Sequence, residues 1–354
     1  MSKKKIKVFD FFSGCGGTAQ GFKQAGLDVI VGIDNDKDAA ETYKYNIKPE
    51  LFLNDDIRNI KTDSIKTYID KYKKENYILF CGCAPCQPFS SQNKKRFSKD
   101  DRRFSLLDEF SRFVEEYEPD FIFFENVPGM KKLKPEESPL YKFEKKLINI
   151  GYYVSGPQVV YAEEYGVPQK RRRLILIASK LNNIEFPKAT HGPMAKKPFV
   201  TVRDAIATLP KLTAGSENKK VLNHKSAKLS EINLARIKNI KEGESIANCS
   251  GELTLKCYNK HKGHADVYGR LKWDEPSITL TTKCTSLSNG RFGHPEQDRA
   301  LTPREAACIQ SFPMNFEFKG AGVTSWGKQV GNAVPVKLAE AFGNNYKQHI
   351  SDNQ

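Results

Sequence analysis

The stretch Asp10-Phe-Phe-Ser-Gly-Cys-Gly-Gly-Thr-Ala19 decides the fold class of this chain. The residues that lead into it, Lys7–Phe12, predict a β-strand, and the residues Thr18–Gln24 predict a helix that Gly26 ends. The spacing Gly14-x-Gly16-x-x-Ala19 is typical of the loop that joins the first strand and helix of a dinucleotide-binding unit. Glycines in such a loop let the backbone approach a ligand without a clash from Cβ.

A carboxylate follows the next predicted strand at the spacing that this loop requires. The strand spans Val29–Ile33 and ends at Asp34, 20 residues after Gly14. A carboxylate at that position suits a ribose because it can accept hydrogen bonds from both hydroxyls. Strand, turn, helix and acid together indicate a nucleoside cofactor, and they do not distinguish NAD from S-adenosylmethionine.

Short apolar runs alternate with helical patterns through the first half of the chain, which predicts an α/β fold with a mostly parallel, Rossmann-like sheet. The runs at 77–81 and 121–124 are continuously apolar, which is typical of strands that helices cover on both faces. Further strands are expected at 152–161 and 174–178, and further helices at 139–150, 303–310 and 335–346. The tail Ser351–Gln354 is expected to fray.

The second half contains a basic and irregular region. The chain has 354 residues with 57 Lys and Arg against 42 Asp and Glu, a formal net charge of +15. Between Leu181 and Lys260 there are 14 basic and 7 acidic residues. Such a charge favours a polyanionic partner, of which nucleic acid is the usual one. We expect two domains, a cofactor-binding one of residues 1–185 with 325–354 and a smaller one of residues 186–324.

Composition excludes several other classes of protein. The sequence has no run of 18 apolar residues and therefore predicts no transmembrane helix. The basic N-terminus is not followed by the apolar segment that a secretory signal needs. Eight cysteines in 354 residues are too sparse for a disulfide framework, which favours a reducing, cytoplasmic compartment.

A cysteine-rich segment, Gly82-Cys-Ala-Pro-Cys-Gln-Pro-Phe-Ser90, directly follows the predicted strand 77–81. Such folds build their sites in the loops at the carboxyl ends of parallel strands. A structural zinc needs four ligands, and because neither a histidine nor a fourth cysteine lies nearby, we predict no metal. Cys81 and Cys83 are expected in the core. Cys86, between two prolines in a predicted polar turn, is the candidate for a reactive thiol.

An acidic residue ends another apolar strand. Glu125 follows 121–124, so its carboxylate is expected in the same cleft as Cys86. A surface or helix-capping role is the alternative for this carboxylate.

Basic side chains cluster in Pro168-Gln-Lys-Arg-Arg-Arg-Leu174. The period of a strand places Gln169, Arg171 and Arg173 on one face. Two guanidinium groups in one cleft suit an anionic or carbonyl-rich group. A solvated basic patch is the alternative.

In this order, these segments resemble the C5-specific DNA cytosine methyltransferases of prokaryotic type II restriction–modification systems. The match runs over most of the chain, and the combination of Pro-Cys-Gln with Gln-x-Arg-x-Arg is specific. The matching segments are Asp10–Gly17, Pro85–Ser90, Asp101–Leu107, Glu125–Val127, Gln169–Arg173, Arg304–Pro313 and Gln329–Pro335. The resemblance implies the S-adenosylmethionine-dependent methyltransferase fold, with residues 186–324 as a target-recognition domain.

The resemblance also implies a pocket for S-adenosylmethionine. Phe12 would face its sulfonium, Asp34 would hold its ribose, and Asp56 would hold its adenine amino group. The other cofactor-binding positions that it implies are Gly14, Gly16, Gly17, Ile57, Pro85 and Asn332. The chain departs from the family at two positions, since members often have Glu in place of Asp34 and an aromatic residue in place of Asn35.

For the reaction, the resemblance implies that Cys86 adds to C6 of cytosine, which makes C5 nucleophilic enough to take a methyl group. Glu125, protonated or sharing a proton, would hydrogen-bond N3 of the base. Arg171 and Arg173, with Gln169 beside them, would bind the O2 side of the base and favour the thiolate. Water is the expected base for the C5 proton, and the cytosine must be flipped out of the duplex.

The basic middle region resembles the family's target-recognition domain. Thr279-Leu280 looks like its Thr-Leu element, for which a plain β-strand is the alternative, and Gln87 and Ser90 are expected to contact DNA. The expected partner is double-stranded DNA, bound by a monomer. A cognate restriction endonuclease that acts on the same site without a stable complex would fit this role.

Three other functions remain open. An NAD-dependent oxidoreductase explains the glycine loop and Asp34, but it leaves Pro85–Gln87 and the arginine pair unexplained. An RNA (tRNA) cytosine-5 methyltransferase would use the same machinery, although the long basic region favours duplex DNA. A catalytically silent DNA-binding module is disfavoured by the intact Cys86, Glu125 and Arg171.

Overall fold

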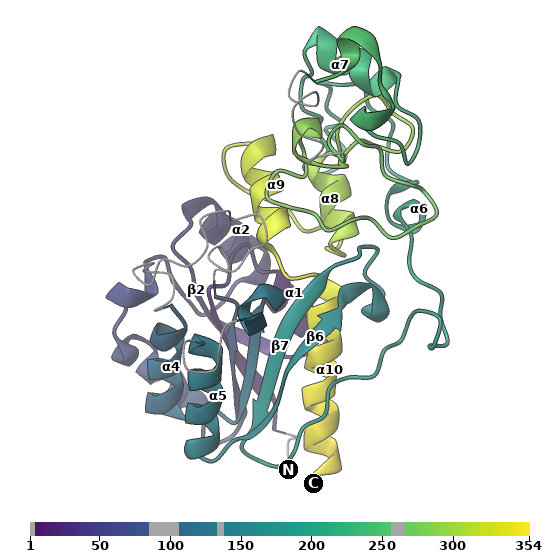
Figure 1. The fold of residues 1–354 in the computed structure, drawn as a ribbon. Coiled ribbons are helices and arrows are strands. Elements are labelled where there is room, and N and C mark those ends of the chain that lie inside the picture. The colour runs from purple at the N-terminus through teal and green to yellow at the C-terminus, as the bar shows by residue number, and fades with distance from the viewer. Residues whose placement is uncertain (1–3, 85–105, 133–137, 256–265) are drawn as a thin grey trace. The chain divides into compact units, whose positions relative to one another are not determined.

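The computed structural model describes residues 4–84, 106–132, 138–255 and 266–354 and divides the chain into two compact units. The first unit comprises Met1–Tyr161, Arg172–Lys188 and Leu338–Gln354. The second unit comprises Ala162–Arg171 and Ala189–Lys337. In Figure 1 the strands lie in the first unit, and the second unit consists of helices and irregular chain.

The first unit is built on one seven-stranded sheet with the strand order β3-β2-β1-β4-β5-β7-β6. Its strands are β1 Ile6–Phe11, β2 Asp28–Ile33, β3 Leu51–Leu53, β4 Tyr77–Gly82, β5 Phe121–Asn126, β6 Tyr153–Tyr161 and β7 Arg172–Ser179. Neighbours from β3 through β5 are parallel, and β7 runs antiparallel to both β5 and β6. The predicted α/β fold with a mostly parallel sheet is therefore confirmed.

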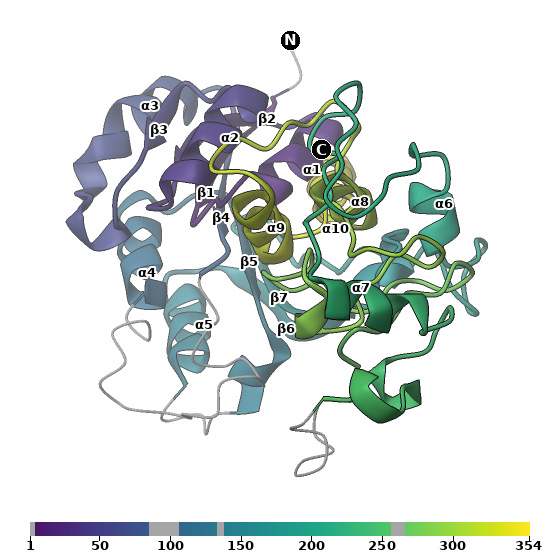
Figure 2. The same cartoon turned by 90° about the horizontal axis from the view of Figure 1, so that it is seen from above.

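In the described part of the chain, six helices lie wholly or largely within the first unit and pack on this sheet. They are α1 Gly17–Gln24, α2 Lys37–Ile47, α3 Lys66–Tyr72, α4 Leu106–Tyr117, α5 Pro139–Asn149 and α10 Val336–Asp352. Figure 2 shows α4 and α5 on one side of β4 and β5, with α1 and α10 on the other. This two-sided cover explains why the strands between them are continuously apolar.

Successive phenylalanines of β5 face helices on opposite sides of the sheet. Phe123 packs edge-to-face on Phe342 of α10, with ring centroids 5.3 Å apart. Phe124, one residue later, packs on Phe143 of α5 at 5.8 Å. The period of two in a strand sends successive side chains to opposite faces, so both faces of β5 contribute to the core.

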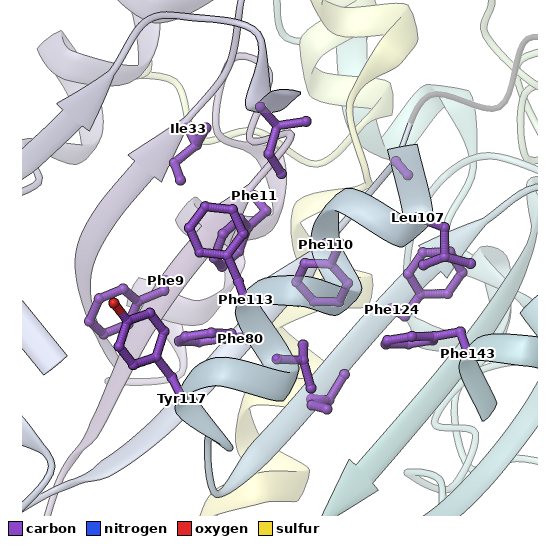
Figure 3. Packing of buried hydrophobic residues seen from close by; sticks show 14 of the residues in the cluster. Phe9, Phe11, Ile33, Phe80, Leu107, Phe110, Phe113, Tyr117, Phe124 and Phe143 are labelled. Atoms are coloured by element: carbon purple, nitrogen blue, oxygen red, sulfur yellow. The ribbon is translucent and has the colours of Figure 1, made fainter. Parts of the chain in front are cut away.

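The larger core cluster lies between the sheet and α4 with α5. Figure 3 shows its aromatic side chains, among which Phe11 contacts Phe80, Phe110 and Phe113 at centroid distances of 5.1, 5.2 and 5.0 Å. All four rings are fully buried. This packing fixes β1 and β4 against α4.

The C-terminal helix is longer than the sequence predicts and includes the first two residues of the tail Ser351–Gln354. Helix α10 continues to Asp352, well past the expected end at residue 346. Tyr346 and Ile350 are buried on the sheet side of α10, and this apolar contact keeps its last turns helical.

The second unit holds helices α6 Val202–Ile206, α7 Glu231–Lys238, α8 Pro303–Ile309 and α9 Val323–Asn332. Strand pairing among its described residues is limited to isolated bridges. Thr302 caps α8 by accepting from Glu305 N, and Pro303 occupies its first turn. Short 3₁₀ turns make up much of the rest of the regular structure in this unit.

In the described part of the second unit, four buried arginines donate hydrogen bonds to backbone carbonyls, which the strands of a sheet would otherwise pair. They are Arg171, Arg270, Arg299 and Arg304, each no more than 4% exposed. Arg270, for example, donates to the carbonyls of Ile240 at 2.6 Å, Ile237 at 2.8 Å and Gln297 at 2.8 Å. A guanidinium has five donors in one plane, so a single side chain can fix several irregular backbone segments.

The compact units have different boundaries from the predicted domains. Residues 162–171 and 325–337 group with the second unit, whereas 186–188 group with the first. Helix α9 packs against a segment of the second unit, since a Cβ on Gly331 would lie 2.2 Å from the carbonyl oxygen of Thr281. Among the described residues, no helix is both long and apolar enough to cross a membrane.

Candidate functional site

The carboxyl ends of β1, β2, β4 and β5 meet at one edge of the sheet because these strands are parallel. The segments that follow them contain most of the predicted site residues. Side chains that are far apart in the sequence are therefore brought to the same edge of the sheet.

The loop after β1 leaves the strand through unusual backbone conformations. Phe12, Gly14 and Gly16 have φ angles of 55°, 53° and 95°. A positive φ costs a phenylalanine about 1–2 kcal/mol, so packing must hold Phe12 in place. Gly17 begins α1, and Ser13 N donates to Ile33 O of β2 at 3.0 Å.

The two loop glycines have different reasons to lack a side chain. A Cβ on Gly16 would lie 3.0 Å from both Ile47 and Tyr43, so that glycine allows close packing on α2. No described atom lies within 4 Å of a Cβ built on Gly14. The space beside Gly14 is therefore open to a ligand.

Asp34 is held at the end of β2 with both carboxylate oxygens oriented by backbone amides. Gly14 N donates to Oδ2 at 2.8 Å, and Asp36 N donates to Oδ1 at 2.8 Å. These two bonds orient the carboxylate at the end of β2, where an acceptor group suits a ribose diol. The predicted pairing of the glycine loop with this acid is thus a direct contact.

The predicted adenine-binding residue has a close partner. Asp56 caps a short 3₁₀ turn, Ile57–Asn59, and its carboxylate accepts from the side chain of Arg58, with Nε to Oδ1 at 2.8 Å. This contact lowers the pKa of Asp56, chiefly through the hydrogen bond from Arg58. Ile57 is buried in the core cluster.

Beneath the glycine loop lies a buried carboxyl group that the sequence did not single out. Asp10 in β1 is 1% exposed, and its Oδ2 accepts from the Tyr43 hydroxyl at 3.1 Å. Burial raises the pKa of Asp10 to about 7. Asp10 Oδ1 and the hydroxyl of Ser13 are buried without a hydrogen-bond partner among the described residues. Two unsatisfied polar atoms so close to the loop are typical of a site that a polar ligand completes.

The predicted nucleophile, Cys86, lies outside the described residues, and so do its neighbours Pro85, Gln87 and Ser90. The chain is described up to Ala84, two residues before Cys86. Asn126, at the end of β5, donates from Nδ2 to the carbonyl of Ala84 at 3.2 Å. Sequence reasoning named Asn126 only as part of a motif, because its partner depends on β4 and β5 being neighbours.

The two other cysteines of this segment were expected in the core. Cys81 is fully buried, and burial raises its pKa well above the ordinary value. Cys83 is half-buried, with its sulfur 4.0 Å from that of Cys81 and 3.5 Å from Thr18 Oγ1. In the described part of the chain, no group of three or more His, Cys, Asp or Glu side chains is placed to hold a metal ion.

A close ion pair joins two of the predicted catalytic residues. Glu125 is the penultimate residue of β5, and Arg173 lies near the start of the neighbouring β7. Arg173 Nε lies 2.6 Å from Glu125 Oε1. Their side chains are only 13% and 10% exposed. A guanidinium at this distance both orients the carboxylate and offsets the cost of burying it.

Arg171 and Gln169 occupy a different environment, inside the second unit. The Arg171 guanidinium donates to the carbonyls of Leu280 at 2.9 Å, Gly331 at 3.1 Å and Ala333 at 3.1 Å. It also donates to Gln169 Oε1 at 3.3 Å, so these two side chains share a face as the period of a strand predicts. Arg171 is 2% exposed and Gln169 is fully buried.

The remaining predicted positions lie near this cluster within the second unit. Thr279 is exposed and donates from Oγ1 to Lys170 O at 2.6 Å, whereas Leu280 is buried. Asn332 is the exposed last residue of α9. Their roles toward DNA and cofactor stay predictions.

Known proteins resemble the chain over almost its whole length. Residues 6–348 match the family of C-5 cytosine-specific DNA methylases. The type II methylase M.HgiDII of Herpetosiphon aurantiacus is 37% identical over 97% of this chain and 95% of its own length. The type II methyltransferase M1.HphI of Haemophilus parahaemolyticus is 34% identical over 95% of this chain and 85% of its own length.

Solved structures share the fold at lower sequence identity. A prophage-encoded DNA modification methyltransferase (E. coli) superimposes with a TM-score of 0.75 at 24% identity, over 98% of this chain and 100% of that one. A DNMT2 of Spodoptera frugiperda superimposes with a TM-score of 0.61 at 20% identity, over 97% and 100%. The match over residues 6–348, together with the two type II relatives, confirms the family that the order of the motifs predicts. The chain belongs to the C-5 cytosine-specific DNA methylase family and is a DNA cytosine-5 methyltransferase of the type II kind.

Proposed function

We propose that this enzyme methylates C5 of a cytosine that is flipped out of double-stranded DNA, through a covalent bond between Cys86 and C6 of the base. The observation that carries the proposal is the buried pair of Glu125 and Arg173 at the end of β5. Strand β4, which is the parallel neighbour of β5, leads directly into Pro85 and Cys86. A carboxyl group, a guanidinium and a thiol are the three groups that the reaction needs.

The residues around the glycine loop fit the cofactor S-adenosylmethionine, which the family implies. Asp34 is oriented by the backbone amides of Gly14 and Asp36, and no described atom lies within 4 Å of a Cβ built on Gly14. The unsatisfied atoms of Asp10 and Ser13 suit a polar ligand that reaches the loop. When bound, this cofactor supplies a methyl group that its sulfonium makes electrophilic. Gly16, Gly17, Phe12, Asp56, Ile57, Pro85 and Asn332 complete the proposed set.

In the proposed reaction, Cys86 adds as a thiolate to C6, and the electron pair of the C5–C6 bond becomes available at C5. Glu125 hydrogen-bonds N3 and shares a proton with it, so negative charge does not accumulate on the ring. Arg173 holds the Glu125 carboxyl in place through Oε1, which leaves the second oxygen to face the base. After methylation, water takes the C5 proton and Cys86 leaves by elimination.

The target base has to leave the duplex because C5 and C6 are not accessible to a thiol in stacked DNA. We assign recognition of the DNA sequence to the domain of residues 186–324, with the exposed Thr279 and its neighbour Leu280 at the DNA and with Gln87 and Ser90 nearby. The enzyme would act as a cytoplasmic monomer. Its methylation would protect host DNA from a cognate endonuclease that needs no stable complex with it.

A trapping experiment tests the covalent step. Plasmid DNA methylated by the purified protein is mapped by bisulphite sequencing, and a duplex of the mapped site is then made with 5-fluorocytosine at the target. Wild type should form a denaturation-resistant adduct because fluorine at C5 prevents elimination. Cys86→Ser should form none and lose activity by orders of magnitude, since a hydroxyl does not ionise usefully.

Cys83→Ser is the matched control and should still form the adduct. Adduct formation by Cys86→Ser, or none by wild type, would contradict the covalent mechanism. Methylation of tRNA with no methylation of DNA would contradict the proposed substrate.

A further inference from the structure

The segment that leads into β7 is paired with the predicted Thr-Leu element. Gln169 and Ser277 form a parallel bridge, and Lys170 N donates to Ser277 O at 2.7 Å. Leu280 N donates to the Gln169 side chain at 2.9 Å. Residues 277–280 are thus held along 168–171 by backbone and side-chain hydrogen bonds together.

A second glutamine ties the same cluster to α9. Gln169 Nε2 donates to Gln310 Oε1 at 2.9 Å, and both side chains are fully buried. Gln310 Nε2 donates in turn to Val330 O at 2.8 Å and Ala333 O at 3.1 Å. Gln310 is separated from Gln169 by 141 positions in sequence, so no local pattern reveals this contact.

Helix α9 also contacts the chain just after the Thr-Leu element. A Cβ on Gly331 would clash with the backbone of Thr281, and one on Gly327 would lie 2.9 Å from Thr285 Oγ1. Cys284 donates from its thiol to the carbonyl of Gly327 at 3.6 Å. The glycine face of α9 therefore packs directly on residues 281–285.

Arg171 lies where these segments join. Its guanidinium donates to Leu280 O on one side and to Gly331 O and Ala333 O on the other. Withdrawing the guanidinium toward a DNA base would break its hydrogen bonds to these three carbonyls inside the second unit, which is costly because the groups are buried. Arg173, two residues later, is less buried and pairs with Glu125 instead.

We propose that Arg171 is a positioning residue of this methyltransferase that, with Gln169 and Gln310, sets the place of the Thr279–Leu280 element and does not touch the target base. The inference rests on the proposed function, because it takes Thr279 and Leu280 to lie at the DNA. The guanidinium that serves the base is then that of Arg173 alone. Loss of the Arg171 contacts lets Thr279–Leu280 shift and weakens discrimination between DNA sequences.

The test compares variants on two duplexes, the site mapped for wild type and the same site with one altered base pair. The readout is the ratio of kcat/KM on the two duplexes. Arg171→Lys and Gln310→Met should each lower this ratio about tenfold, the scale of a single base contact. Because both act through one cluster, the double variant should lower the ratio no further than the larger single effect.

Two matched variants separate this role from its rivals. Arg173→Lys should lower turnover on both duplexes and leave their ratio unchanged. Arg304→Lys changes another buried arginine of the second unit, which donates to Leu222 O and Phe316 O, away from Thr279. It should lower the melting temperature as Arg171→Lys does while leaving the ratio unchanged.

The proposal is overturned if Arg171→Lys lowers turnover on both duplexes equally, since that indicates contact with the base. It is also overturned if Arg304→Lys lowers the ratio as much at equal stability, since that indicates a merely structural role. Gln310→Met keeps the test decisive if Arg171→Lys does not fold. If wild type does not methylate DNA, the proposed function is contradicted and not the role of Arg171. The bisulphite mapping of wild type gives this result before any variant is made.

Discussion

At the scale of single residues, the first unit buries two carboxyl groups, those of Glu125 and Asp10, and gives them different partners. Glu125 has an arginine 2.6 Å away, whereas Asp10 accepts a hydrogen bond from the neutral Tyr43 hydroxyl. The difference decides protonation at Asp10, whose pKa burial raises to about 7. A carboxyl group without a cationic partner becomes easier to bury when it carries a proton.

This buried carboxyl predicts a pH dependence of stability. Asp10 has a folded pKa of about 7 against an ordinary 3.8, so between these values the folded state holds a proton that the unfolded chain has released. Stability should therefore fall as the pH rises from about 4 to about 7. Asp10→Asn cannot ionise and should be more stable relative to wild type at pH 8 than at pH 5, measured by thermal denaturation.

Asp70→Asn is the control, because the Asp70 side chain is 65% exposed and should show no such difference. Equal pH profiles for wild type and Asp10→Asn would show that Asp10 is ionised throughout this range.

At the scale of elements, the site depends on which strands are neighbours. Strand β5 contributes Glu125 toward β7 and Asn126 toward the chain that leaves β4. Two successive residues of one strand thus reach the segments on both sides of it. The order β4-β5-β7 is what allows this arrangement.

A substitution at Asn126 should act on the nucleophile segment through Ala84. Asn126→Asp keeps the acceptor for Val127 N and loses the donor to Ala84 O. One hydrogen bond of about 1 kcal/mol corresponds to a several-fold slower reaction, so the rate of 5-fluorocytosine trapping should fall about five- to tenfold. Adding more enzyme should not restore it, because DNA binding is unchanged.

The control for this substitution is Asn76→Asp, which removes a similar bond from Nδ2 to Tyr72 O just before the start of β4. It should leave the trapping rate at the wild-type value. A normal rate in Asn126→Asp would show that the bond to Ala84 does not position the segment.

The strands were easier to predict than their helices. Continuous apolar runs predicted β4 and β5, but α2 and α4 were not expected. Helix α4 has a strongly one-sided apolar face, which is typical of a helix packed on a sheet. Its first two residues belong to the Asp101–Leu107 motif, and this segment was assigned to the motif and not to a helix. Helix α9 contains the first four residues of the Gln329–Pro335 motif and was likewise not expected to be helical.

The sequence predicted the site residues that lie at the end of a strand. It did not predict the roles of residues whose hydrogen-bond partners are distant in sequence. Asp34 and Glu125 were found from position alone. Arg171 and Arg173 were indistinguishable in sequence, because a period of two places both on one face. Their roles separate only through Leu280, Gly331 and Ala333, whose carbonyls no sequence pattern identifies.

At the scale of the whole molecule, the two units differ in how they hold together. The first unit has a regular sheet and one large aromatic cluster. The second has a smaller apolar cluster and, in addition, arginines that bind backbone carbonyls. Such contacts to the backbone place few demands on the side chains of the segments they hold, so these segments can vary in sequence and still be bound.

This tolerance predicts that sequence specificity can be transferred. Replacing about residues 186–290 with those of a relative that methylates another site should transfer that site to this enzyme. Arg171 and Gln169 can still bind a grafted 277–280 segment, because they contact its backbone. Bisulphite sequencing of plasmid DNA gives the new site, and a folded, active chimaera that still methylates the original site would contradict the assignment of recognition to this region.

The position of α10 has a consequence for how the protein is made. Its Phe342 and Tyr346 cover Phe123 and Phe121 of β5, yet the ribosome adds Ala189–Lys337 between the last strand and this helix. At ~5–20 residues per second, that addition takes roughly 7–30 s. Throughout that interval the nascent chain lacks the helix that covers Phe121 and Phe123 of β5. A chain that stops before residue 338 should therefore leave these aromatic side chains uncovered and be prone to aggregate.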